Sequence, residues 1–100
     1  MLKITNILLE QERKRLLGKV KITYTDSSSV MDVAEILRAI EDVTVVDTAG
    51  GDRSKNESIY EVKFLTNKDP KQAFLFLKKK AMESPEIIRL DVATKSIEFF

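Results

Sequence analysis

The chain has 100 residues, 43% apolar and 33% charged, which predicts one globular domain rather than a disordered chain. Its 17 Lys and Arg nearly balance its 16 Asp and Glu, so no overall field favours nucleic acid or an anionic membrane. It contains neither cysteine nor histidine, which removes disulfides, thiolate nucleophiles and the most frequent general base and metal ligand. No apolar run approaches the roughly 20 residues that span a bilayer. We therefore expect no enzyme, no cofactor, no metal, no specific nucleic acid and no membrane partner.

Residues 1–18 are the first predicted segment, an amphipathic N-terminal helix that ends at Gly18, where a helix-terminating glycine belongs. Arg13, Lys14 and Arg15 would occupy its last turns, the end of a helix that favours cations. Its apolar residues do not form one clean stripe. We expect this helix to pack loosely on the domain or on a partner.

The rest of the chain alternates between the two-residue period of strands and the 3.6-residue period of helices. Strands are predicted over residues 19–25, 43–48, 59–66 and 86–92, and helices from 30 to about 41 and from 70 to about 83. Asp69, Pro70 and Gln72 have the N-cap, N1 and N3 roles of a strong helix start.

This strand-helix-strand-strand-helix-strand order resembles the ferredoxin-like split βαβ fold, and we assign residues 19–100 to such an α+β domain. Two right-handed crossovers would place both helices on one face of an antiparallel sheet with strand order 4-1-3-2. In the last strand, Ile88, Leu90 and Val92 are in phase and are expected to face the core. The phase then shifts, which predicts a bulge or tight turn near Thr94.

The strand phase decides whether the sheet could bind RNA. Tyr24, Tyr60 and Phe64 are in phase with aliphatic residues, and exposing them would bury charged neighbours such as Lys63, which is costly. We therefore expect these aromatics in the core, unlike the exposed aromatics on which RNA-recognition motifs stack bases. The open face is then expected to carry a mixture of charges, from Lys19, Lys21, Thr23, Glu61, Lys63, Arg89 and Asp91.

The stretch Asp47-Thr48-Ala49-Gly50 matches a sequence with which small GTPases hold Mg²⁺ and the γ-phosphate. The glycine-rich phosphate loop that must accompany it is absent. Residues 49–58 instead predict a long hairpin loop, with Gly50 and Gly51 at backbone angles that other residues resist. The nearby aspartates Asp47 and Asp52 lack the alternating oxygen ligands of a calcium loop, so we expect them to be solvated.

Surplus apolar residues indicate a contact surface. In the helix from residue 70, Leu75 and Phe76 lie on opposite sides of the stripe that contains Phe74, so one stripe cannot bury both. Exposed clusters of large apolar side chains tend to mark contacts. We expect Leu75 and Phe76, together with Leu8 and Leu9 of the N-terminal segment, to be protein-interaction residues.

These observations predict a non-catalytic interaction or structural module whose partner is a protein, with self-association as a homodimer the leading case. The alternative is that the N-terminal segment folds back and covers the surplus apolar surface. A cytoplasmic location fits the absence of cysteine.

Residues 39–46, Ala-Ile-Glu-Asp-Val-Thr-Val-Val, look like the helix-to-strand passage of ACT regulatory domains, which have the same topology. The resemblance implies a site for a small amino acid at a subunit interface, near the turn between the first strand and the first helix. That turn is Thr25-Asp26-Ser27-Ser28 here, and it carries no glycine. The resemblance makes an ACT-like regulatory domain the alternative function.

Residues 1–10 resemble the short amphipathic leaders of small structural proteins from tailed phages. In that family such leaders direct proteins into the prohead, and a protease cuts after a Leu-x-Glu-like site. Leu8-Leu9-Glu10 matches that site. The resemblance implies a virion-associated protein that loses its first ten residues.

Overall fold

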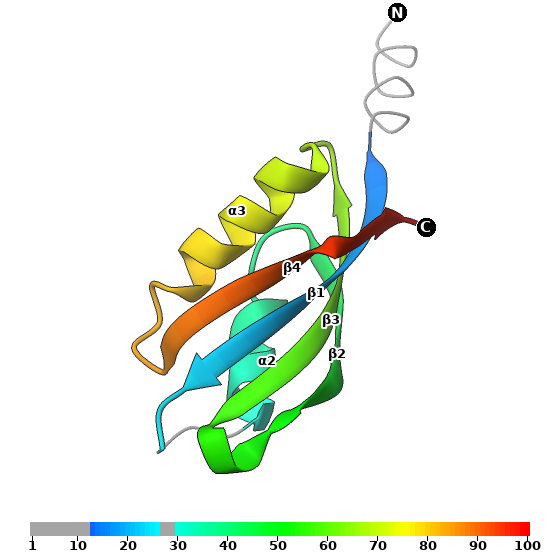
Figure 1. The fold of residues 1–100 in the computed structure, drawn as a ribbon. Helices are drawn as coiled ribbons and strands as arrows, with labels where there is room; N and C mark the ends of the chain where they lie inside the picture. The colour runs from blue at the N-terminus through cyan, green and yellow to red at the C-terminus, as the bar shows by residue number, and fades with distance from the viewer. Residues whose placement is uncertain (1–12, 27–29) are drawn as a thin grey trace, which may run out of the picture.

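The computed structural model describes residues 13–26 and 30–100, which form one four-stranded antiparallel sheet with two helices packed on one face (Figure 1). The elements are β1 (Lys14–Tyr24), α2 (Val30–Arg38), β2 (Val43–Asp52), the short 3-10 helix η1 (Arg53–Lys55), β3 (Glu57–Thr66), α3 (Pro70–Ala81) and β4 (Ile87–Phe99). The predicted α+β class, with an antiparallel sheet and two helices, is confirmed. The strands lie in the order β2-β3-β1-β4, which is β4-β1-β3-β2 from the other edge.

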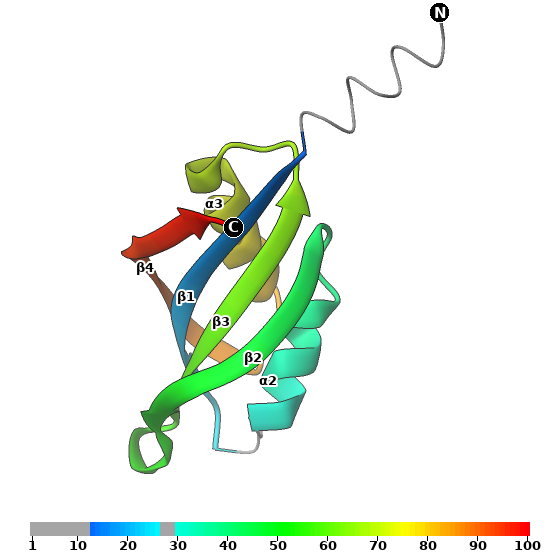
Figure 2. The same ribbon diagram turned by 90° about the vertical axis from the view of Figure 1, so that its right-hand side faces the viewer.

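The core fills the space between the sheet and the two helices, which lie behind the sheet in Figure 2. Tyr24, Tyr60 and Phe64 are all buried in it, as their strand phase predicts. From the helices, Leu37 and Leu77 are completely buried against the same layer. The opposite face of the sheet is therefore left to polar side chains. Neither helix of the described residues has the length and apolar character of a bilayer span.

The start of β1 corrects the prediction of an N-terminal helix over residues 1–18. Residues 14–17 are already strand, and β1 pairs with β3 from its first residue, Lys14, opposite Thr66. Leu16, Gly18 and Val20 continue one inward-facing alternation, so Gly18 does not end a helix. The remainder of the predicted helix lies outside the described residues.

Gly18 is required by packing. A Cβ placed on it would lie 2.4 Å from Cζ of Phe74, far inside van der Waals contact. The ring of Phe74 lies over β1 at this point, and a side chain on Gly18 would need the same space. Gly18, which was predicted to end a helix, is therefore the residue that lets α3 approach the sheet.

The hairpin between β2 and β3 is longer and tighter than predicted. Strand β2 continues to Asp52, so the loop expected over residues 49–58 shrinks to η1 and Asn56. Gly50 and Gly51 lie inside the strand with φ of 144° and 128°, next to a register shift after Thr48. The predicted need for glycine backbone angles is confirmed, but these angles serve a bulged strand.

Strand β4 contains the bulge predicted near Thr94. Leu17 pairs with Glu98, whereas Lys19 pairs with Ala93, so residues 94–97 leave the ladder. Ser96 fills the gap, because its Oγ accepts a hydrogen bond from the backbone N–H of Lys19 (2.8 Å) and donates one to the carbonyl of Ala93 (2.6 Å).

A second irregularity at the start of β4 reverses one predicted orientation. Thr23 pairs with Arg89 and Tyr24 with Ile87, so the ladder skips Ile88. Ile87 is buried and Ile88 is exposed, which makes the prediction that Ile88 faces the core wrong. A one-residue shift exchanges the two faces of a strand, and the ladder that causes it is not visible in the sequence of β4 alone.

Helix α3 begins as predicted. The carboxylate of Asp69 accepts a hydrogen bond from the backbone N–H of Gln72 (3.1 Å), and Pro70 occupies the first turn. The helix ends at Ala81 rather than near residue 83, and α2 ends at Arg38 rather than near residue 41.

Candidate functional site

An apolar groove lies between α3 and the C-terminal half of β4. Its volume is about 530 Å³. We call it the α3–β4 groove, and its apolar lining consists of Pro70, Phe74, Leu75, Val92, Ile97 and Phe99. Lys71 and Glu98 contribute one charge of each sign, so the groove is apolar with a sparse charged rim.

The bulge of β4 shapes one wall of this groove. Residues 94–97 leave the ladder with β1, and the strand rejoins it at Glu98 and Phe99. This detour brings Ile97 and Phe99 to the same groove as Leu75 of α3. Leu75 is 58% exposed and Phe99 is 63% exposed, so two large apolar side chains flank one opening without cover from the described residues.

The two predicted contact residues of α3 have different environments. Leu75 lines the α3–β4 groove, whereas Phe76 lies on the other flank of the helix, in a hollow shared with Ile36 of α2. Two ammonium groups lie near the Phe76 ring, with Lys68 Nζ 4.7 Å and Lys80 Nζ 5.7 Å from its centroid. Phe76 is therefore half-buried and lies near two cations, whereas Leu75 is 58% exposed.

The remaining predicted contact residues, Leu8 and Leu9, lie outside the described residues. Phe99 and Ile97 were missed as members of a site. Their signal in the sequence is the shift of strand phase near Thr94, which predicts a bulge but not the helix that faces it. The site therefore joins two features that the sequence shows separately.

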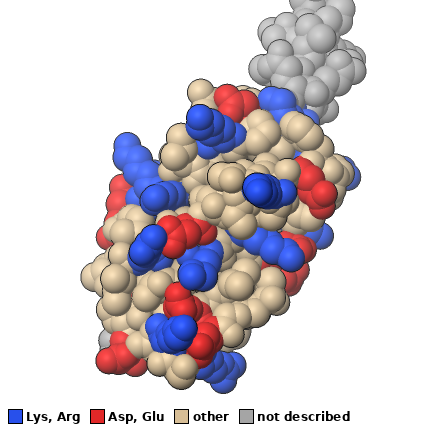
Figure 3. Space-filling model, in the orientation of Figure 1, with Lys and Arg blue, Asp and Glu red and all other residues tan. Residues whose placement is uncertain are grey.

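The basic clusters at residues 13–15 and 78–80 do not merge into a phosphate track. Figure 3 shows Lys and Arg interspersed with Asp and Glu over the face that it presents. On the open sheet face, Lys21 pairs with Glu57 at 3.2 Å, and Arg89 with Asp91 at 2.9 Å. The first pair joins β1 to β3 and the second lies within β4, and such local neutralisation disfavours binding of a polyanion.

The GTPase-like stretch lies on the edge strand β2. Asp47 is opposite Glu61 in the register, and Asp52 caps η1 by accepting hydrogen bonds from the backbone N–H (3.0 Å) and Oγ (2.5 Å) of Ser54. These hydrogen bonds hold the pKa of Asp52 below its ordinary value of 3.8. Over residues 13–26 and 30–100, no group of three or more acidic residues is placed to hold a metal ion.

Tyr60 also has a displaced pKa. Burial raises the pKa of its phenol to about 12, and the hydroxyl donates a hydrogen bond to the carbonyl of Val30 at 2.9 Å. This bond ties β3 to the first turn of α2 inside the core. Neither Tyr60 nor Asp52 lines the α3–β4 groove.

Comparison with known proteins does not add a family to this geometry. No protein-family model matches the sequence, and no curated protein matches it either. The function is therefore inferred from the groove and from the charges around it.

Proposed function

We propose that this protein is a non-catalytic interaction module that binds another protein chain through the α3–β4 groove. The observation that carries the proposal is the pairing of Leu75 and Phe99, both more than half exposed, on the two sides of one apolar opening. Burying a large apolar side chain fully contributes roughly 1.5–3 kcal/mol, so covering the exposed parts of Leu75 and Phe99 favours binding.

The polarity of the groove favours a protein chain over a small metabolite. A volume of about 530 Å³ would hold either. Small-molecule sites, however, use polar groups that converge on the ligand and fix its orientation, whereas six of the nine residues that line this groove are apolar and the polar ones are Lys71, Thr94 and Glu98. Aliphatic and aromatic side chains of a protein match such a surface.

A second copy of the chain is the simplest partner. In a twofold dimer each patch contacts its own equivalent, so an apolar patch is automatically complementary in polarity. The groove also adjoins β4, which is an edge strand of the sheet, and an edge widens the area that two copies could bury together. A stable interface needs roughly 800 Å² from each partner, which requires the groove and its surroundings.

Light scattering during size-exclusion chromatography tests self-association over a wide range of protein concentration. We expect the wild-type mass to rise toward that of a dimer, and Leu75→Glu to hold the protein as a monomer because a carboxylate in the apolar contact would lose its water. Met31→Glu is the matched control, because Met31 is 63% exposed on helix α2 and does not line the groove. A Leu75→Glu variant that associates like Met31→Glu contradicts self-association through this groove.

An ACT-like regulatory domain is the second candidate. One observation favours it: a hollow of about 260 Å³ beside the first residue of α2, where Arg53 could neutralise a carboxylate. The other lining residues are Val30, Thr48, Gly50, Gly51, Glu57 and Ser58. The order of the elements β1 to β4 supports a ferredoxin-like classification, which this candidate shares. A thermal-shift screen of amino acids tests it, since a ligand at 100 times its Kd adds about 2.7 kcal/mol of stability.

A role in a phage particle remains a proposal supported by residues 1–10, which lie outside the described residues. Incubation with a matched prohead protease should release a chain that begins at Gln11. An N-terminus that stays intact would remove this proposal and leave the groove unaffected.

A further inference from the structure

We infer that the α3–β4 groove is the docking site of residues 1–12 of the same molecule, which cover it until a partner chain displaces them. This inference rests on the proposed function, because it names the segment that regulates access to the interaction groove. It is carried by the place where the described chain begins, by the length of the segment and by its composition.

The first point is position. Strand β1 begins near the start of α3 and the end of β4 (Figures 1 and 2), and these two elements line the groove. Leu16 pairs with the groove residue Phe99, and Lys14 Nζ donates a hydrogen bond to the backbone carbonyl of Asn67 (3.5 Å), shortly before α3. Residues 1–12 therefore join the domain at the mouth of the groove.

The second point is reach. Twelve residues span up to about 40 Å when extended and about 18 Å as a helix. Helix α3 also has 12 residues and is about 18 Å long, so the segment can turn back and follow the whole groove in either form.

The third point is composition. Five of the first nine residues are Leu or Ile, and Lys3 is the one charged side chain among them. Such a segment matches the groove, where Leu75, Val92, Ile97 and Phe99 present apolar atoms. Lys3 and Glu10 flank residues 4–9, which contain four of these five apolar residues. The groove rim likewise carries one anion and one cation, Glu98 and Lys71.

The covalent link between the segment and the domain favours the chain's own segment over that of a second copy. A segment joined by a short linker has an effective concentration in the millimolar range. At micromolar protein the segment of the same molecule therefore occupies the groove first. A partner must compete with it, so a change that weakens this docking should strengthen binding of the partner.

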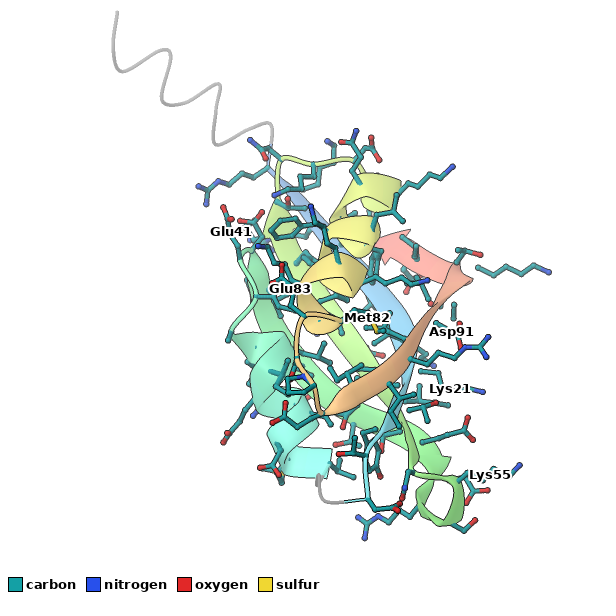
Figure 4. All side chains as sticks on the ribbon, turned by 90° about the vertical axis from the view of Figure 1, so that its left-hand side faces the viewer. Lys21, Glu41, Lys55, Met82, Glu83 and Asp91 are labelled. Carbon is teal, nitrogen blue, oxygen red and sulfur yellow. The ribbon has the colours of Figure 1, made fainter. Side chains whose placement is uncertain are left out.

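Paramagnetic relaxation in the full chain tests the docking directly. The chain has no cysteine, so Asn6→Cys gives a single site for a nitroxide in the segment. We expect this label to broaden the methyl signals of Leu75, Val92 and Ile97, which line the groove. The signal of Ile36 should stay sharp, because this α2 residue lies in the hollow on the other flank of α3. The control label is Lys55→Cys, at the hairpin tip labelled in Figure 4, which should broaden none of the four.

A second pair of variants separates docking from a general effect of the label. In the labelled chain, Leu8→Asp should abolish the broadening at the groove, whereas Gln11→Asp adds the same charge at a polar position and should retain it. In the unlabelled chain, Leu8→Asp should also shift self-association to lower protein concentration, because the groove is then open.

Two results would overturn the inference. One is weak, even broadening across all four methyl groups. The other is broadening that appears only when labelled and isotope-enriched molecules are mixed, which would place the segment on a second copy. A Leu8→Asp chain that stays monomeric, when the wild type shows groove broadening, refutes self-association while the docking stands. Self-association that is lost in Leu75→Glu without any groove broadening refutes the docking alone.

Discussion

Gly18→Ala is the substitution whose effect the structure predicts most directly. The new methyl group would lie 2.4 Å from Cζ, 2.9 Å from Cε1 and 3.1 Å from Cε2 of Phe74. The ring cannot easily move, because Phe74 is 2% exposed and makes an edge-on contact with Phe64 at a centroid distance of 5.0 Å. The substitution therefore forces a close-packed core to open.

The magnitude follows from two opposing terms. Overfilling a packed core costs about 1–3 kcal/mol. Alanine recovers roughly 0.5–1 kcal/mol in a strand, because it loses less backbone entropy than glycine, and Gly18 is not among the glycines with positive φ. We expect a net loss of about 1–2 kcal/mol in the free energy of unfolding, with a fall in Tm of roughly 4–8 °C for each kcal/mol.

Urea denaturation followed by circular dichroism measures this loss, with Lys19→Ala on the exposed neighbour as the control, expected within about 0.5 kcal/mol of wild type. Phe74→Leu should cost roughly 1–2 kcal/mol alone, through lost apolar burial and a small cavity. It should cost less in the Gly18→Ala background, because the shorter side chain relieves the clash. A Gly18→Ala protein as stable as wild type, or two strictly additive substitutions, would refute the packing role of Gly18.

Two further substitutions each test one local interaction, the N-cap of α3 and the buried phenol of Tyr60. Asp69→Ala should lower the free energy of unfolding by about 1 kcal/mol in urea denaturation, because the Gln72 N–H loses its cap, and Asp69→Asn should retain most of it; equal losses in both would contradict capping. Burial raises the pKa of Tyr60 from 10.0 to about 12, so above pH 10 the unfolded chain ionises while the folded chain does not. The stability that this contributes is fully present below pH 10 and is lost as pH rises toward 12, by about 2 kcal/mol in the urea-derived free energy. Tyr60→Phe should flatten that decline, and an unchanged decline would show that Tyr60 does not cause it.

The predicted and observed folds agree where neighbouring residues decide the structure. The start of α3 depends on Asp69, Pro70 and Gln72, which lie within one turn of each other. The inward direction of Tyr60 and Phe64 follows from strict alternation in β3, which holds over its full length. In both cases the interacting groups are close in sequence, so their pattern carries the information.

The errors occur where distant residues meet. Gly18 looks like a helix terminator until Phe74 is seen to occupy the space of its missing side chain. Ile88 alternates in sequence with the inward-facing Leu90, which predicts that it faces the core. The pairing of β4 with β1 skips Ile88, and its side chain is exposed.

Periodicity and composition can be read from the chain alone, so they already specify the α+β class, the phase of the central strands and the lack of histidine and cysteine. The groove that Leu75 and Phe99 flank, and the position of β1 beside it, appear only once the chain is folded. Side chains of α3 and β4 form that groove, and the bulge that brings them together depends on pairing with a third element, β1.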